Sequence, residues 1–292
     1  MTSIQTWGRD YVQLLSSHLD PIDIIMLGRA FPLLIQHLKK YLVQSLARKI
    51  DRHFRSHYGA KYYDEFVTMM RRTEVCVSGS FVLGMFLLNA DESWSKSDID
   101  FYAPYGLPCW NGTHVNNAET FFYDVQGWKN THTGLYMQFC GEIATVRDYH
   151  PSRLDLATQT SQPGSFISTR FEKFQVITIQ DKRPRGIYQT SIPSDFSRHS
   201  VREFIVNTFD FNVLMNIFYY DENGPQVEIG DLKSILEMAV QFDPNAYLKK
   251  FEHISSSGLY NRIKKYKKRG FKFVGPEWDE NRYPPEVKPW YL

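Results

Sequence analysis

The chain has 292 residues, of which 42% are hydrophobic and 23% are charged, and its formal net charge is +2. This is an ordinary globular composition, and a chain of this length buries enough surface to fold without disulfides or a structural metal. Its apolar runs fall far short of the roughly 20 residues that span a bilayer, and the N-terminus lacks the basic-then-apolar pattern of a signal peptide. We therefore expect an intracellular protein, cytoplasmic or nuclear, that is not secreted and has no membrane partner.

The three cysteines, Cys76, Cys109 and Cys140, are odd in number and widely spaced. None of them belongs to a C-x-x-C pair, so the sequence favours neither a disulfide framework nor a zinc site. The oligomeric state is left open by the sequence.

Residues 1–72 form a predicted N-terminal helical segment, because residues 10–72 favour helix throughout. Between residues 31 and 54, apolar side chains recur every three or four positions, which predicts one long amphipathic helix. Pro32 suits the first turn of that helix, so a shorter helix at about 22–30 is expected to end just before it.

From residue 74 onward, short strands alternate with helices, and residues 73–225 are assigned to one core. Val75–Val77 predicts a buried strand, Gly79 a permissive turn, and Ser80 the N-cap of a helix. A second predicted strand contains Ile99 and ends at Pro104.

The remaining elements follow the same kind of pattern. A helix is predicted near 117–126, strands near 135–146 and at 174–179, a helix at 199–207 and a strand at 209–220. Residues 226–292 form a predicted C-terminal helical region, with helices at about 231–242, 245–254 and 258–269 and a tail that carries Pro and Trp. Gly270 is expected to end the last of these helices.

Two acids and a Gly-Ser turn form the most informative pattern in the sequence. Asp98 and Asp100 are separated by one residue on a predicted strand, so their side chains point to the same face. Carboxylates held this close repel unless a cation lies between them, and Mg²⁺ prefers such oxygen ligands together with substrate phosphates. Gly79 and Ser80 complement the acids, because free N–H groups at a helix N-terminus attract phosphate.

This ordered pattern resembles the nucleotidyltransferase superfamily that shares a polymerase-β-like core. Val77 precedes the turn, Gly79-Ser80 matches it, and Asp98-Ile99-Asp100 matches the acid-hydrophobic-acid strand, which is entered through Ser97. The spacer at 81–97 is longer than usual for the family. The resemblance implies an α+β fold, with a nucleotidyltransferase-like mixed β-sheet flanked by helices, between the N-terminal helical segment and the C-terminal helical region.

The family also implies a third carboxylate on a separate strand, and Asp210 fits that place. An acid between two aromatic residues is costly to bury without a partner, and a metal shared with Asp98 and Asp100 would provide one. The resemblance therefore implies that these three acids are the catalytic residues and bind Mg²⁺ or Mn²⁺. Gly79, Ser80, Ser97 and Lys173 are the candidate residues for binding the nucleotide phosphates; for Lys173, an exposed position at a strand edge is an equally good interpretation.

Within the superfamily, the sequence is most similar to a group found in fungi and large DNA viruses, on the strength of a Phe-Asp segment, an aromatic strand and a basic stretch near the C-terminus. That stretch begins at Arg262 and ends at Phe271. It either lies solvated at the end of its helix or contacts the phosphate backbone of RNA. The candidate nucleic-acid contacts are Arg262, Lys264, Lys265, Lys267, Lys268 and Arg269.

Two functions remain open at this point. The first is Mg²⁺-dependent nucleotidyl transfer from an NTP to a hydroxyl acceptor, with RNA or another nucleic acid as the expected partner. The second is a binding or adaptor protein that keeps the fold without turnover. The second is favoured by a faint similarity of 19–27 to the opening of an F-box, a helical module that recruits ubiquitin-ligase machinery.

Overall fold

The computed structural model of the chain describes residues 18–31, 35–87, 98–104, 129–134, 143–150, 174–179, 198–242 and 256–275. The predicted helices at 117–126 and 245–254 lie outside these ranges, as do Ser97 and Lys173. Within the described ranges, no helix is both long enough and apolar enough to cross a membrane.

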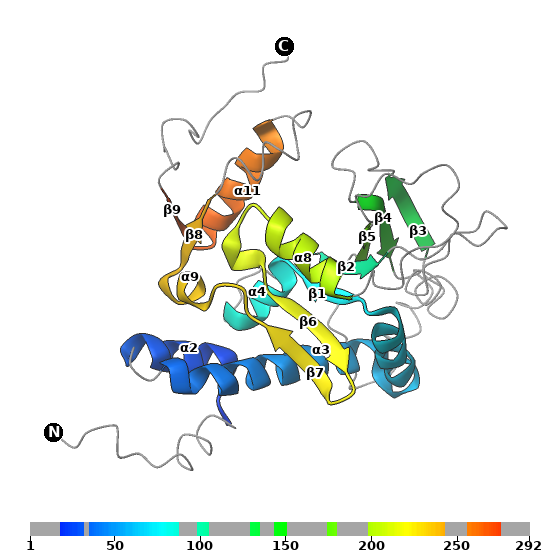
Figure 1. Cartoon of the computed structure of the whole chain (residues 1–292), viewed down its shortest axis with the longest axis horizontal. Helices are drawn as coiled ribbons and strands as arrows, with labels where there is room; N and C mark the ends of the chain where they lie inside the picture. The colour runs from blue at the N-terminus through cyan, green and yellow to red at the C-terminus, as the bar shows by residue number, and fades with distance from the viewer. Residues whose placement is uncertain are drawn as a thin grey trace, which may run out of the picture.

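The fold is α+β, as predicted, and is built on a mixed sheet of seven strands in the order β3-β4-β5-β2-β1-β6-β7. Figure 1 shows the sheet running from β7 near the centre to β3 at the right. Within this sheet, β2 and β5 pair in parallel, and all other neighbouring strands pair antiparallel. The strands are β1 (Cys76–Ser78), β2 (Ile99–Pro104), β3 (Lys129–Gly134), β4 (Ile143–His150), β5 (Phe174–Ile179), β6 (Ile217–Asp221) and β7 (Gly224–Glu228).

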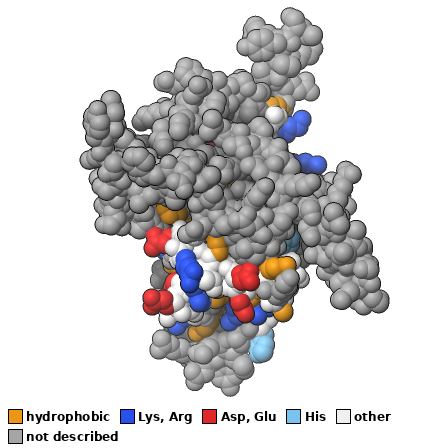
Figure 2. All heavy atoms as spheres, turned by 90° about the vertical axis from the view of Figure 1, so that its right-hand side faces the viewer, with side chains coloured by type: hydrophobic (Ala, Val, Ile, Leu, Met, Phe, Trp, Pro, Cys, Tyr) orange, Lys and Arg blue, Asp and Glu red, His pale blue; other side chains and the backbone are white. Residues whose placement is uncertain are grey.

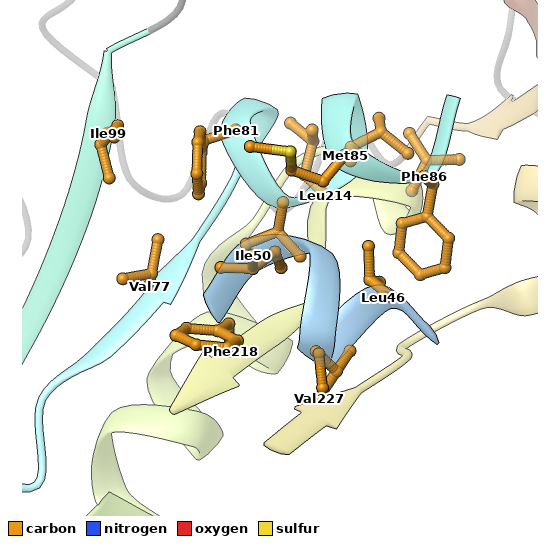
Figure 3. Packing of buried hydrophobic residues seen from close by; sticks show 14 of the residues in the cluster. Leu46, Ile50, Val77, Phe81, Met85, Phe86, Ile99, Leu214, Phe218 and Val227 are labelled. Carbon is orange, nitrogen blue, oxygen red and sulfur yellow. The ribbon is translucent and has the colours of Figure 1, made fainter. Parts of the chain in front are cut away.

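Successive side chains of a strand point to opposite faces of the sheet, and apolar side chains on both faces of the central strands are covered by helices. Val77 and Phe101 belong to a large core that includes residues of α3 (Ile35–Thr73) and α4 (Ser80–Leu87). Figure 3 shows Ile50 of α3 between Phe81 of α4 and Phe218 of β6. On the opposite face, Tyr102 packs in a second cluster with residues of α8 (Arg198–Thr208).

The predicted N-terminal helices form, but they are interrupted. α2 (Pro21–Ala30) ends before Pro32, as predicted. The stretch up to residue 72 is helical as predicted, but α3 is broken at Gly59, where φ is 65° and ψ is 174°. A backbone in this region is essentially restricted to glycine, and it divides α3 into two helical parts.

Three polar side chains connect the two parts of α3 to the sheet. Asp51, in the first part, accepts hydrogen bonds from the hydroxyl of Tyr63, in the second part, and from that of Tyr220 on β6, the latter at 2.9 Å. Because buried polar groups must be paired, this network fixes the direction in which the chain leaves Gly59.

The strand predicted at 209–220 is wrong in its first half. Residues 212–214 form a 3-10 helix, η4 (Asn212–Leu214), and β6 begins only at Ile217. Asn216 explains the break, since its side-chain amide donates to the carbonyl of Val213 at 2.6 Å and accepts from the N–H of Gly230 at 3.2 Å. Asparagine side chains that bond to nearby backbone in this way compete with a β ladder.

The C-terminal region contains two short strands that were predicted as helix or left unassigned. α9 (Leu232–Glu237) ends at Met238, which has φ of 51°, and β8 (Ala239–Gln241) follows. α11 (Ser256–Lys268) ends at Gly270, which has φ of +85° as expected for a glycine terminator, and β9 (Lys272–Val274) pairs in parallel with β8.

A single hydrophobic core contains residues from all three predicted segments, from Ile24 in α2 to Phe273 in β9. The boundary predicted at 225 falls within β7. The division into 1–72, 73–225 and 226–292 stays a prediction about chain organisation.

Candidate functional site

The Gly-Ser turn and the acid strand meet at the centre of the sheet. Ser78, the last residue of β1, lies opposite Asp100 of β2 in the antiparallel register. Gly79 follows with φ of +82° and leads into α4, whose first residue is Ser80. A Cβ atom added to Gly79 would lie 3.1 Å from Oδ2 of Asp100. The glycine therefore permits a close approach between the turn and this carboxylate.

The hydroxyl of Ser78 holds the end of β1 in place. It donates a hydrogen bond to the backbone carbonyl of Asn216 at 2.7 Å, and Asn216 directly precedes β6. Ser78 is fully buried, so this bond satisfies a hydroxyl that burial would otherwise penalise. The turn at Gly79 is consequently anchored on both sides, by α4 and by the chain before β6.

Asp98 and Asp100 differ in their exposure to solvent. Asp98 directly precedes β2 and is exposed, whereas Asp100 is partly buried. Asp100 is also in register with Gln175 on the parallel strand β5, so an amide neighbours this carboxylate on the sheet.

Asp210 is placed differently from the prediction. It lies in the turn after α8 rather than on a strand, and its side chain is only 3% exposed. Nη1 of Arg262, on α11, forms an ion pair with its Oδ2 at 2.8 Å. The guanidinium also lies over the ring of Phe211, 5.1 Å from the ring centre. Asp210 thus has a cationic partner within the chain, which was the requirement for burying it.

α11 brings basic residues to the same region as the acids. Burial lowers the pKa of Lys265, and the charges of Asp100 and Asp98 oppose that effect. Burial raises the pKa of Tyr102, which also experiences the charges of Asp100, Arg262 and Asp210. Lys265 is thus within the electrostatic influence of Asp98 and Asp100, and Arg262 contacts Asp210.

The basic stretch of α11 is divided between two environments. Arg269 is buried, with its guanidinium 5.3 Å from the ring centre of Tyr266. Lys264, Lys265, Lys267 and Lys268 are exposed, and Arg262 is partly buried. Arg262 and Arg269 are seven residues apart, which places them on one side of the helix, and this spacing is the sequence signal for basic residues on its more buried side. The sequence interpretation treated all six residues as one surface and missed the pairing of Arg262 with Asp210.

No group of three or more His, Cys, Asp or Glu side chains that could hold a metal ion occurs among the residues that the structure describes. The assignment of Asp98, Asp100 and Asp210 as metal ligands stays a prediction, and Asp210 is in addition paired with Arg262. Asp98 and Asp100 retain the chemistry that suits one Mg²⁺ or Mn²⁺ ion, since both are carboxylates on neighbouring positions of one face and Asp98 is open to solvent.

Comparisons with known proteins give structural neighbours only. No family model and no curated protein matches the sequence. Among solved structures, the chain is similar to a CCA-adding enzyme in its apo form I, with 10% identity, a TM-score of 0.41, and coverage of 75% of this chain and 41% of that one. The complex of a CCA-adding enzyme with ATP gives 11% identity, a TM-score of 0.41, and coverage of 74% and 40%. The complex with CTP gives 10% identity, a TM-score of 0.40, and coverage of 74% and 41%.

This chain thus spans about two fifths of the length of the solved chains that it resembles. A similarity at this level decides neither the substrate nor the activity. The chemistry of the site has to be argued from its own residues.

Proposed function

We propose that this chain transfers a nucleotidyl group from an NTP to a hydroxyl of RNA or another nucleic acid, with Mg²⁺ or Mn²⁺ held by Asp98 and Asp100. The observation that carries the proposal is the approach of Gly79 to Asp100, with 3.1 Å between the Cβ position of the glycine and Oδ2 of the acid. It brings the turn at Gly79, which is of the kind that binds phosphate, next to the acids at the start of β2, which suit a metal ion.

The reaction forms one bond and breaks one. The acceptor oxygen bonds to the α-phosphorus of the NTP, the bond from that phosphorus to the β-phosphate oxygen breaks, and pyrophosphate leaves with the electron pair while the hydroxyl proton passes to solvent. A divalent ion would supply positive charge to activate the hydroxyl and to stabilise the departing pyrophosphate.

The residues of this chain would bind and orient the nucleotide. Asp98 and Asp100 would hold the ion, and Ser80, at the first position of α4, would donate to the phosphates beside the backbone of Gly79. Ser97 and Lys173 keep their proposed phosphate-binding role but lie outside the described residues.

The nucleic acid is proposed to bind along the exposed side of α11. Lys264, Lys267 and Lys268 are exposed there. In the lower part of the face seen in Figure 2, by contrast, the described Lys and Arg side chains are intermixed with Asp and Glu. Binding through lysines would be indifferent to base sequence and would weaken steeply with salt.

The test is a transfer assay with each labelled NTP, Mg²⁺ or Mn²⁺, and total cellular RNA. We expect label transfer by the parent and its loss in the double variant Asp98→Asn/Asp100→Asn. Asp64→Asn, an exposed acid on α3, is the matched control and should transfer at the parent rate. Absence of transfer by the folded parent with every nucleotide would overturn the proposal.

A second candidate function is a nucleotide-binding or adaptor protein without turnover. It is favoured by the ion pair between Arg262 and Asp210, which provides the third predicted acid with a partner other than a metal. The F-box-like segment offers it less support, because Ile24 and Ile25 of α2 are fully buried in the core of this chain. Equilibrium binding of ATP by a chain that transfers no label would select this function.

A further inference from the structure

The ion pair between Arg262 and Asp210 is the best-defined polar contact near the acids. The carboxylate is almost fully buried, and the guanidinium forms an ion pair with it at 2.8 Å while covering the ring of Phe211. An Arg guanidinium is planar and rigid, so a carboxylate at its edge and a ring against its face restrict its orientation. Asp210 and Phe211 therefore fix the guanidinium in one orientation.

The same guanidinium remains accessible on its other side. The Arg262 side chain is 41% exposed, whereas that of Asp210 is 3% exposed. A guanidinium carries five N–H donors in a fork that matches phosphate oxygens. Lys265, one turn further along α11, is within the electrostatic influence of Asp98 and Asp100.

The charges in this cluster favour a polyphosphate once a metal is bound. Three acids, at 98, 100 and 210, are balanced by three bases, at 262, 265 and 269, so the described cluster has a net charge near zero. One divalent ion on Asp98 and Asp100 would raise that charge to about +2, which attracts the phosphates of an NTP.

We propose that Arg262 binds the phosphate chain of the NTP and that Asp210 is the positioning residue that holds it, rather than a third metal ligand. The inference rests on the proposed nucleotide-binding role of this site, but not on turnover. It assigns Asp210 to Arg262 on α11 and leaves the metal to Asp98 and Asp100 at the start of β2.

The test measures binding of inorganic tripolyphosphate to the full chain by calorimetry in the presence of Mg²⁺. Arg262→Gln is expected to weaken binding at least tenfold, and Asp210→Asn about threefold to tenfold, because the guanidinium loses its orientation. The double variant Arg262→Gln/Asp210→Asn is expected to bind no more weakly than Arg262→Gln alone. Lys272→Gln removes an exposed charge just beyond α11 and should change the affinity less than twofold.

A second measurement separates positioning from metal ligation. Mn²⁺ affinity without phosphate should fall at least tenfold in Asp98→Asn and change less than twofold in Asp210→Asn. Arg262→Gln removes the cation that is paired with the buried carboxylate of Asp210, which can destabilise the chain. The double variant Arg262→Gln/Asp210→Asn removes both charges and serves as a second test. Thermal unfolding checks that each variant is folded.

Three results would overturn the inference. They are a parent chain that does not bind tripolyphosphate, an Arg262→Gln variant that binds it as tightly as the parent, and an Asp210→Asn variant that loses Mn²⁺ affinity while keeping that for tripolyphosphate. Loss of nucleotidyl transfer with the predicted tripolyphosphate results intact would instead reject only the proposed enzymatic function.

Discussion

Replacing Gly79 with alanine tests the close approach between the turn after β1 and the acid strand. At φ of +82°, any residue other than glycine costs about 1–2 kcal/mol. The new methyl group would also lie 3.1 Å from Oδ2 of Asp100, which forces the carboxylate to move. An off-rotamer side chain costs about 0.5–1.5 kcal/mol, so the free energy of unfolding should fall by about 1.5–3.5 kcal/mol in total.

Gly224→Ala is the matched control for the backbone contribution. Gly224 also has a positive φ, of +108°, but an added Cβ atom there would meet nothing within 4 Å. Urea unfolding of both variants should therefore show a larger loss for Gly79→Ala. In an Asp100→Ala background the extra loss should vanish, because the contacting carboxylate is gone.

The same substitution should weaken Mn²⁺ binding, since the displaced carboxylate of Asp100 is a proposed ligand. Equal losses of unfolding free energy in Gly79→Ala and Gly224→Ala would refute the contact on which the proposed site depends. Unchanged Mn²⁺ affinity in a folded Gly79→Ala variant would refute its importance for the metal.

Three further predictions concern the framework around the site. Gly230→Ala would place a methyl group 2.7 Å from the carbonyl oxygen and 2.8 Å from the Cβ atom of Met215, so a loss of about 1–3 kcal/mol is expected in urea unfolding, and parent-like stability would contradict this packing. Tyr220→Phe removes the 2.9 Å hydrogen bond to Asp51 and should cost about 1 kcal/mol by the same assay; no loss would argue against a role for this bond in holding α3 to β6. Burial lowers the pKa of His57 to about 4, so the unfolded chain binds the proton more tightly between about pH 4 and the ordinary value of 6.5. Stability should then fall as pH is lowered through that window, by about 3 kcal/mol, and His57→Gln should flatten the profile; identical pH profiles for the two chains would exclude His57 as the cause.

Local patterns in the sequence predicted those elements whose structure depends mainly on their own residues. The strand at 174–179 and the helix before Pro32 form as expected, and β1 and β2 frame the Gly-Ser turn. Alternation of side chains, helical periodicity and the special conformations of glycine and proline are all properties of short segments. They were sufficient to predict alternating strands and helices and to single out Asp98 and Asp100, while the α+β fold was implied by the family resemblance.

The failures occur where a segment has distant partners. Residues 212–216 are apolar and asparagine-rich and were predicted as strand, but Asn216 bonds to Val213 and Gly230 instead of continuing a ladder. Residues 239–241 were predicted to extend a helix, yet they pair with β9, about thirty residues away in the sequence. Such choices depend on tertiary contacts that override local propensity.

The candidate site divides in the same way. The sequence by itself determined which residue types are present, namely an acid pair one residue apart, a Gly-Ser turn and a basic helix. Only the tertiary structure decided that this helix packs beside the acids, that Arg262 is the partner of Asp210, and that the basic stretch has a buried side and an exposed side. The physical reason is that a buried charge requires an opposite charge at close range, and the identity of that partner depends on how α8 and α11 are placed in space rather than on the residues adjacent in the chain.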